Sequence, residues 1–288
     1  MSRPALVVLA AGRARRFGGV KPLAPIGPEH EAVIDLLASD AAQAGFGQIV
    51  LVLNPDSGPQ IRAHVEELWP KDLSVGFAIQ ERPLGTVHAV LAARDVVDPS
   101  VGFAVVNADD LYGVEALSLA AAALTASPRN LLVGFRLRNA IAGDEPVTRG
   151  VCEVTDGLLS GIAERRSVTA SDGTFASADG MEPAQLDPES IVSMNLWGFA
   201  PEMWAVFAEA MAQATDASED AEVLLPEVVG RVVAGSLDAP NGLRRVEVIP
   251  TESRCIGVTH PGDLDVVRSE LIELVAQGRR APGLFTAR

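Results

Sequence analysis

The first loop of the chain carries residue types that suit the binding of a polyphosphate. Ala10, Ala11 and Gly12 are small, so the backbone can approach a ligand closely and present successive N–H groups to an anion. Arg16 and Lys21 add cationic side chains, the first a planar fork and the second a point charge. The loop matches neither a Walker A motif nor G-x-G-x-x-G. The pattern favours phosphate binding over the alternative, an ordinary surface turn with solvated arginines.

A second loop of interest, residues 80–86, lies where an apolar segment leads into a predicted helix. Gln80 offers a donor and acceptors, which suits recognition of the edge of a nucleotide base. Gly85 permits close contact with a ligand, and Thr86 is placed to cap the helix. Taken alone, the segment is equally typical of a plain β–α loop.

Two adjacent carboxylates, Asp109 and Asp110, follow a further apolar segment. Mg²⁺ is typically held by one or two carboxylates, with water and substrate phosphate completing its shell. The alternative is a helix N-cap, for which Asp is a common residue. Because three predicted strand ends carry ligand-binding residue types, we favour a metal site here.

Apolar and amphipathic segments alternate over the first half of the chain. We predict strands at 5–9, 48–53, 73–79, 101–106 and 130–135, and helices at 32–44, 57–69, 86–94 and 115–126. This alternation is typical of a mostly parallel sheet with helices on both faces. Ligands of such sheets bind beyond the carboxyl ends of the strands, which is where the three loops fall. The predicted fold is α/β: a three-layer α/β/α sandwich with a Rossmann-like, mostly parallel but mixed sheet.

The pattern changes after residue 136 and predicts a smaller β-rich insertion. Asp156 and Gly157 form a good hairpin turn between short strands at 151–155 and 158–162. The segment 167–189 is polar and predicts a loop or flap. The remaining predicted elements are strands at 191–199 and 245–249 and helices at 201–212, 221–234 and 261–276. We expect one domain made of an α/β half (1–136), a smaller β-rich lobe (137–200) and a return to the core (201–288).

Composition excludes several classes of protein. The 288 residues carry a formal net charge of −15, which disfavours binding to nucleic acids and to anionic membranes. Cys152 and Cys255 form no metal-binding pattern and are expected to be buried thiols. No apolar run is long enough to span a membrane, and we expect a cytoplasmic protein. The arginines at 279 and 280 predict a solvated end or a contact in a homo-oligomer.

Seven segments, in order along the chain, resemble motifs of the sugar-1-phosphate nucleotidylyltransferase superfamily, most closely a branch similar to UTP–glucose-1-phosphate uridylyltransferases. The segments are LAAGRARRFGGVKPL (9–23), QERPLGTVHAVLAA (80–93), VVNADDLYG (105–113), TRGVC (148–152), IAERRSV (162–168), SMNLWGF (193–199) and GVTHPGDL (257–264). The resemblance implies transfer of a nucleotidyl group from an NTP, with UTP or dTTP favoured, to a sugar-1-phosphate. It also implies Mg²⁺ as cofactor and direct in-line attack without a covalent enzyme intermediate.

The resemblance further implies roles for individual residues. Arg16 would hold the leaving pyrophosphate, Lys21 would bridge the reacting phosphates, and Asp109 would bind the metal. The nucleotide would be held by Ala10, Ala11, Gly12, Arg13, Gln80, Gly85, Thr86 and Asn107. The acceptor would be held by Asp110, Gly150, Glu164, Arg165 and Asn195, with Arg165 facing its phosphate.

The chain departs from the motifs at two places. Ala14 replaces a usual glycine, and Gly257, Val258 and Thr259 stand where relatives have a second acidic metal ligand. We therefore name Thr259 as the second candidate ligand, with Asp263 as a residue that could reach. This departure supports an alternative, a catalytically silent protein that binds a nucleotide or sugar nucleotide. Transfer to a non-glucose phosphorylated acceptor is also open, whereas a glycosyltransferase would leave the first loop unexplained.

Overall fold

The computed structural model describes residues 2–12, 18–141, 145–171, 173–257, 263–278, 280–281 and 283–285. Four parallel strands form one half of its main sheet, in the order β4 (Phe103–Asn107), β1 (Ala5–Ala10), β2 (Gln48–Leu53) and β3 (Val75–Ile79). Strands β1, β2 and β4 are short apolar runs because helices cover both faces of the sheet. Their carboxyl ends meet at one edge and bring together the three loops singled out above.

The second half of the sheet is mixed. Strand β11 (Ile191–Phe199) runs antiparallel to β4 and to β6 (Asn130–Arg136), and β12 (Val246–Thr251) runs parallel to β6. Antiparallel strands continue from there: β8 (Leu158–Ser171), β9 (Thr174–Ser177) and β10 (Gln185–Leu186), with β7 (Val147–Thr155) pairing with both β8 and β11. A separate two-stranded pair joins β5 (Asp110–Leu111) to β13 (Ile256–Gly257).

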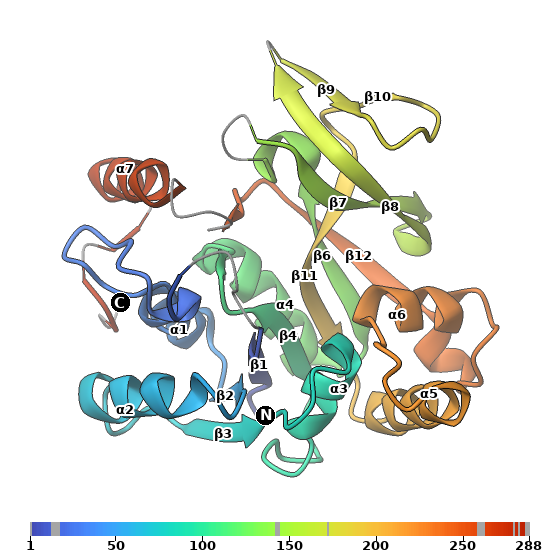
Figure 1. The fold of residues 1–288 in the computed structure, drawn as a ribbon, viewed down its shortest axis with the longest axis horizontal. Coiled ribbons are helices and arrows are strands. Elements are labelled where there is room, and N and C mark those ends of the chain that lie inside the picture. The colour runs from blue at the N-terminus through green and yellow to red at the C-terminus, as the bar shows by residue number, and fades with distance from the viewer. Residues whose placement is uncertain are drawn as a thin grey trace.

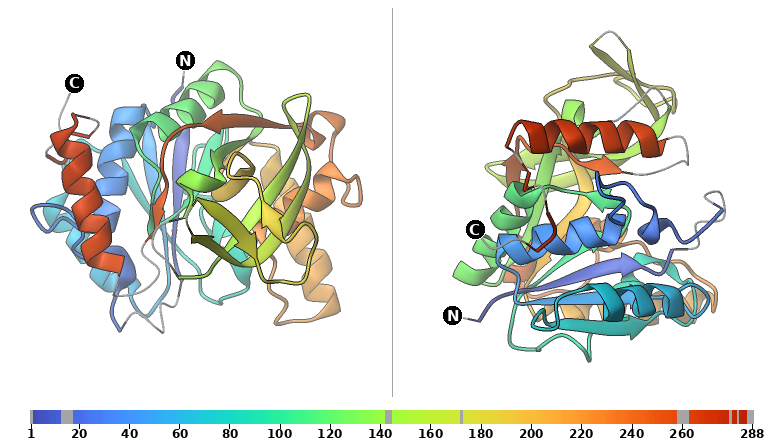
Figure 2. Two further views of the ribbon diagram at one scale, coloured as in Figure 1. Left: turned by 90° about the horizontal axis from the view of Figure 1, so that it is seen from above. Right: turned by 90° about the vertical axis from the view of Figure 1, so that its left-hand side faces the viewer.

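Helices pack on both faces of the sheet (Figures 1 and 2). Residues of β1 alternate between two hydrophobic clusters, so the clusters lie on opposite faces. One cluster includes residues of α1 (Val33–Ala44), α2 (Gly58–Leu68), α4 (Val114–Ala126) and α7 (Asp263–Ala276), and the other includes residues of α3 (Gly85–Ala92), α5 (Met203–Ala217) and α6 (Leu225–Val233). Three short 3₁₀ turns lie at Lys21–Leu23, Leu137–Asn139 and Asn241–Arg244.

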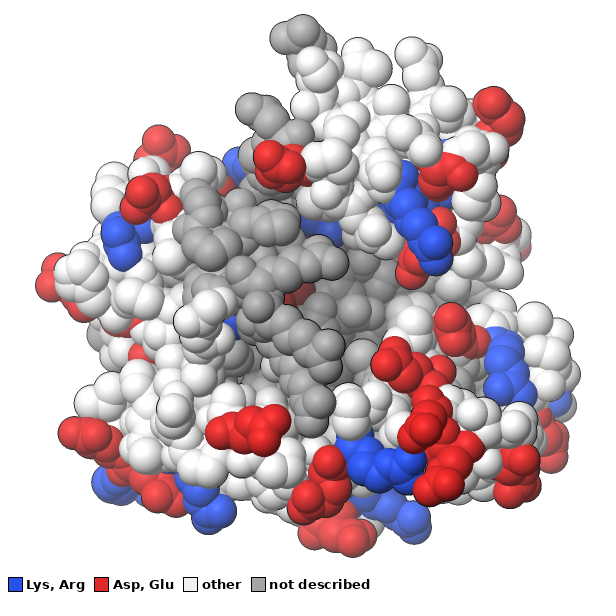
Figure 3. Space-filling model, viewed as in Figure 1, with Lys and Arg blue, Asp and Glu red and all other residues white. Residues whose placement is uncertain are grey.

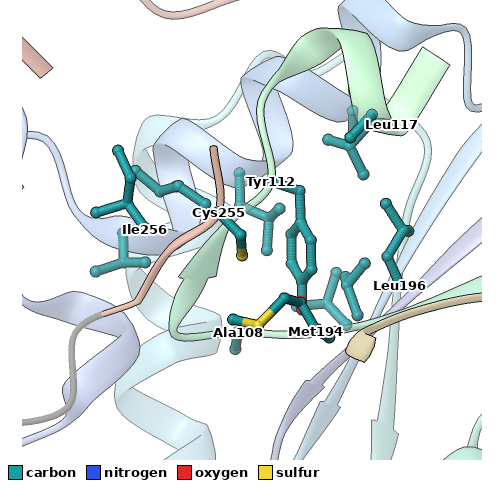
Figure 4. Packing of buried hydrophobic residues seen from close by; sticks show 14 of the residues in the cluster. Ala108, Tyr112, Leu117, Met194, Leu196, Cys255 and Ile256 are labelled. Carbon is teal, nitrogen blue, oxygen red and sulfur yellow. The ribbon is translucent and has the colours of Figure 1, made fainter. Parts of the chain in front are cut away.

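Tyr112 ties the end of β4 to β11. Its ring is buried between Leu117 of α4 and Met194 of β11, with Cys255 beside it (Figure 4). The Tyr112 hydroxyl donates to the carbonyl oxygen of Met194 at 2.9 Å and accepts from the N–H of Asn107 at 3.0 Å. A buried tyrosine needs such partners, and here they fix the strand end that carries the two aspartates.

The predicted three-layer α/β/α fold is confirmed, and so is the hairpin turn at 156–157. Asp156 and Gly157 have φ values of 51° and 75°, as a two-residue turn between twisted strands requires. The segment 167–189 is only partly loop, because β8 continues to Ser171 and β9 and β10 follow it. The helix predicted from residue 221 begins at Leu225. No helix in the described part of the chain is both long and apolar enough to cross a bilayer.

Two local predictions are wrong. The Thr86 hydroxyl does not cap its own helix, because it accepts a hydrogen bond at 2.7 Å from the N–H of Leu225, the first residue of α6. Arg280 is not a solvated end, since its guanidinium is buried against Asp40, with Nη1 2.8 Å from Oδ2. Arg279 lies outside the described residues. In both cases the partner is distant in sequence, and local pattern gives no sign of it.

Candidate active site

A cavity of about 950 Å³ opens beside the carboxyl end of β4. Its walls come from the loop after β4, from strands β7, β8 and β11, and from helix α6. The face of the molecule in Figure 3 is hollowed in its middle, and acidic side chains gather over α5 and α6 at its lower right. The cavity walls themselves carry both signs of charge, including Lys21, Arg149, Asp109 and Asp110. Such a mixture suits a site that binds phosphate together with a cation.

An ion pair between Lys21 and Asp109 lies at the edge of this cavity. Lys21 begins a 3₁₀ turn after the first loop, and Asp109 lies in the turn that follows β4. The Lys21 Nζ donates to Asp109 Oδ2, although the two residues are 88 positions apart. Their side chains are 15% and 35% exposed, so both groups reach the cavity while keeping contact with each other. The fold thus brings together the predicted phosphate cation and the predicted metal ligand.

Asp110 is placed beside this pair, and a glycine makes room for it. Burial raises the pKa of Asp110 to about 7, the Asp109 charge adds to the rise, and a hydrogen bond from Asn107 Nδ2 at 2.9 Å opposes it. Gly257 of β13 pairs with Asp110 of β5. A Cβ at position 257 would lie closer than 3.0 Å to Asp110 Oδ1. Residue 257 must be glycine if the Asp110 carboxylate is to stay where it is.

The loop at 80–86, which is predicted to recognise the base, packs against the segment before α6. The Gln80 side-chain amide nitrogen lies 3.0 Å from the carbonyl oxygen of Gly85 and 3.2 Å from His88 Nδ1. Gly85 has φ +89°, and a Cβ there would lie 2.5 Å from the backbone nitrogen of Val223. Glycine is therefore required at position 85 both by its conformation and by the close approach of residue 223.

Asn54 supports the first loop, although it belongs to none of the three segments with ligand-binding residue types. It directly follows β2 and is buried. Its Nδ2 donates to the carbonyl oxygen of Ala11 at 3.2 Å, and its Oδ1 accepts from the N–H groups of Asp56 and Ser57. A polar residue directly after a buried strand, at the edge where ligands bind, was the available signal.

Strands β7, β8 and β11 bring the predicted acceptor residues to one wall. Gly150 pairs with Glu164 of β8 and with Ser193 of β11. Asn195 lies where the register between β11 and β6 shifts, has φ +62°, and accepts a hydrogen bond from Trp197 Nε1 at 3.2 Å. Gly150, Glu164 and Asn195 all line the cavity.

Arg165 does not face the cavity, contrary to the role that the resemblance implied. Its guanidinium is 4% exposed and forms a two-pronged ion pair with Asp179, at 2.8 and 3.1 Å. It also donates to the carbonyl oxygens of Met181 and Pro183. Neighbouring residues of a strand point to opposite faces, so Glu164 and Arg165 could not both have faced the acceptor. Arg166 lines the cavity instead, with its Nε 2.9 Å from Glu164 Oε1.

Arg149 is a second residue that the sequence analysis passed over. It lies in β7 next to Gly150 and lines the cavity. Its Nε donates to the carbonyl oxygen of Ala140 at 2.8 Å, and its Nη1 donates to that of Thr148 at 2.7 Å. Burial lowers the pKa of Arg149 from its ordinary value. Its only sequence signal was its position immediately before Gly150.

Several predicted residues cannot be placed in this site. Arg13, Arg16 and Thr259 lie outside the described residues. Asp263 begins α7, but its side chain lies outside the described part as well. Within that part, no three His, Cys, Asp or Glu side chains gather into a metal-binding group. Both thiols are buried as predicted, and burial raises the pKa of Cys152 to about 12 and that of Cys255 well above its ordinary value.

The fold is similar to that of several solved nucleotidyltransferases. The inositol-1-phosphate CTP transferase from T. maritima superposes with a TM-score of 0.66 at 13% identity, over 95% of this chain and 98% of that one. A Bacillus anthracis protein assigned as a glucose-1-phosphate thymidylyltransferase gives 0.66 at 11% identity, over 93% and 94%. A UDP-glucose pyrophosphorylase complexed with UDP-glucose gives 0.63 at 13% identity, over 95% and 99%.

Sequence comparison gives a narrower but independent result. Residues 6–144 match the model of the MobA-like NTP transferase domain. The match begins in β1 and ends before β7, so it includes all three loops at the strand ends but not the cavity wall formed by β7, β8 and β11. No curated protein matches the chain significantly. The findings support an NTP transferase domain, and they leave the nucleotide and the acceptor open.

Proposed function

We propose that this protein transfers a nucleotidyl group from an NTP to a sugar-1-phosphate or a similar phosphorylated polyol, releasing pyrophosphate. The observation that carries the proposal is the Lys21–Asp109 pair at the edge of a cavity of about 950 Å³. The match of residues 6–144 to an NTP transferase domain supports the reaction class. The solved structures of similar fold support a phosphorylated polyol as acceptor.

In the proposed reaction an acceptor phosphate oxygen attacks the α-phosphorus of the NTP. The new P–O bond forms as the bond to the β-phosphate bridging oxygen breaks, and pyrophosphate leaves with that oxygen. Lys21 stabilises the negative charge that gathers on the phosphates, in a position held by Asp109. No protein nucleophile is needed, and the Cys255 thiol in the cavity wall stays protonated because burial raises its pKa.

The residues present fit a divalent cation. Asp109 and Asp110 supply hard carboxylate oxygens, and Asn107, whose Nδ2 is used by Asp110, has its amide oxygen left to bind. Gly257 leaves the space that Asp110 occupies. We propose that Asp109 and Asp110 hold Mg²⁺, which when bound would neutralise triphosphate charge. Asp110 Oδ1 lies closer than 3.0 Å to the position that a Cβ of residue 257 would take, so Asp110 supplies a carboxylate there. The lack of an acidic residue at position 257 therefore no longer favours a catalytically silent protein.

The acceptor hydroxyls are assigned to the wall formed by Gly150, Glu164 and Asn195. Glu164 brings a carboxylate to this wall, and Asn195 is held by Trp197 in a strained backbone conformation. Gln80, Gly85 and the backbone of residues 10–12 are assigned to the nucleotide. UTP and dTTP remain the favoured donors on the resemblance of residues 80–93. The Gln80 Nε2 is used by Gly85, so its Oε1 is the atom that would accept from the N–H of uracil or thymine.

The test is pyrophosphate release by the purified protein. UTP, dTTP, CTP, GTP and ATP are each combined with glucose 1-phosphate and with inositol 1-phosphate, with Mg²⁺ or with excess EDTA. We expect release with one or two nucleotides, and none in EDTA. Lys21→Ala should lower kcat/KM roughly 10²–10³-fold, as loss of one charge-stabilising group does, with an unchanged circular dichroism spectrum.

Each outcome separates the alternatives. Nucleotide binding without release from any pair would favour a silent nucleotide-binding protein. Release that persists in EDTA would contradict the metal assignment, and full activity of Lys21→Ala would remove Lys21 from the mechanism. Lys71→Ala is a matched control, because Lys71 is an exposed lysine whose ammonium contacts the backbone carbonyl of Glu66.

A further inference from the structure

Two cations of the cavity wall, Arg149 and Arg231, have no ion-pair partner among the described residues. Lys21 is paired with Asp109, Arg166 with Glu164, and Arg231 Nη2 donates to Gln213 Oε1. Within the described part of the chain, no carboxylate lies within 4.0 Å of the Arg149 guanidinium. Its two hydrogen-bond partners are neutral carbonyl oxygens, which orient the group without balancing its charge.

An unbalanced and largely buried cation is costly unless an anion binds there. Arg149 lines the cavity, and its printed hydrogen bonds within the described residues go to carbonyl oxygens. An anion that enters from the cavity is therefore the partner available to balance its charge.

The position of Arg149 indicates which anion this is. It belongs to the β7 wall of the cavity together with Gly150, whereas residues 10–12 and 80–86 are not among the residues that line this cavity. A Cβ at Gly150 would lie 3.0 Å from the side chain of Ile162, so the residue beside Arg149 has to be small. Arg165, the residue first expected to bind the acceptor phosphate, is fully occupied by Asp179 and two carbonyl groups.

We propose that Arg149 binds the phosphate monoester of the acceptor and holds it against the Lys21–Asp109 pair. The proposal rests on the proposed function for the identity of the reaction but not for the charge of the ligand. Two backbone carbonyls fix Nε and Nη1, so the planar guanidinium is oriented before the ligand arrives. Its remaining N–H groups are the donors for the phosphate oxygens.

The test measures binding rather than turnover. Glucose 1-phosphate, inositol 1-phosphate and the unphosphorylated glucose and inositol are titrated into the full chain by calorimetry, as is the best nucleotide from the panel above. We expect the wild type to bind at least one of the two phosphate monoesters and neither unphosphorylated compound. Arg149→Gln should raise the Kd of the phosphate monoester about 10–100-fold, as loss of a charge-assisted hydrogen bond does.

Two further variants keep the test decisive. Arg149→Lys retains the charge but loses the planar fork, and should weaken the monoester less than Arg149→Gln does. Arg231→Gln removes another cation of the cavity wall and should change the Kd by less than about twofold, in keeping with the small effect of a solvent-screened charge. In both Arg149 variants the Kd of the nucleotide should also stay within about twofold, because the nucleotide is held elsewhere.

The remaining outcomes each overturn the proposal. They are a monoester Kd unaffected by Arg149→Gln, an equal loss of nucleotide and monoester binding in Arg149→Lys, and a wild type that binds neither monoester. Turnover by a wild type whose Arg149→Gln variant binds normally would refute this inference and leave the proposed function intact. If Arg149→Gln loses monoester binding but the wild type never releases pyrophosphate, the inference about Arg149 stands and the proposed function is refuted.

Discussion

Substitution of Gly257 by alanine tests the assignment of Asp110 to the metal site. The new Cβ would lie closer than 3.0 Å to Asp110 Oδ1 and 3.6 Å from its Cγ, whereas ordinary contacts begin at 3.4 Å. Because β5 and β13 are paired at these two residues, the backbone resists separation. The side chain of Asp110 is expected to rotate away and to lose its 2.9 Å hydrogen bond with Asn107.

The size of the effect follows from the bond that is lost. A hydrogen bond to a charged group contributes about 1.5–3 kcal/mol, and overpacking of a site costs about 1–3 kcal/mol. If the binding free energy of the cation falls by this amount, its Kd rises by about 10–100-fold. Mn²⁺ serves as the probe, and its binding is followed by electron paramagnetic resonance, which does not depend on turnover.

The control for this variant is Gly242→Ala. A Cβ at residue 242 has no neighbour within 4 Å, and its φ lies outside the left-handed region. Its Mn²⁺ affinity should equal that of the wild type. If Gly257→Ala binds Mn²⁺ as tightly as Gly242→Ala does, Asp110 takes no part in holding the cation, and the reasoning from Gly257 is refuted.

Two further predictions concern positions that support the site. Gly85→Ala should destabilise the protein by about 2–4 kcal/mol, because it combines a left-handed conformation with contact to the rigid backbone of Val223. Thermal unfolding measures this, and Gly173→Ala, which shares the positive φ but has open space, should lose clearly less; equal losses would exclude the close approach as a cause. The hydrogen bonds from Arg165 hold the pKa of Asp179 well below its ordinary value, so this ion pair stabilises the fold above the ordinary pKa of an aspartate, and the stabilisation is lost as the pH falls below it. Denaturant unfolding between pH 6 and about pH 2, a range that spans the ordinary pKa of an aspartate, should therefore show a smaller loss of stability in Asp179→Asn than in the wild type; identical pH profiles would contradict the assignment.

Strands β4 and β11 form close to where the sequence predicts them, so local sequence is enough to locate these two strands. Residues 103–106 and 191–199 are buried apolar segments bounded by polar or small residues, and each forms the expected strand. The turn at 156–157 was equally predictable, because Asp-Gly accepts the positive φ values that the hairpin needs. Such features depend on a few neighbouring residues, so the sequence contains all the information that decides them.

The acceptor wall was less predictable because its residues come from three strands. Period-two alternation alone should have assigned Glu164 and Arg165 to opposite faces. That Arg166 faces the cavity also depends on the register shift near Arg149, where β8 contributes an extra residue and Ser167 has φ +52°. Register shifts of this kind re-aim side chains and depend on the pairing partner.

The sequence by itself determined the alternating α/β fold, the three loops at the strand ends and the residue types for phosphate and metal binding. Apolar periodicity and glycine placement are local, and the carboxyl ends of parallel strands must converge. Only the tertiary structure decided which residues have partners. Asp179 occupies Arg165, Gly257 leaves its space to Asp110, and Arg149 lines the cavity without a described carboxylate partner. These outcomes depend on distances between residues far apart in the chain, which no local pattern specifies.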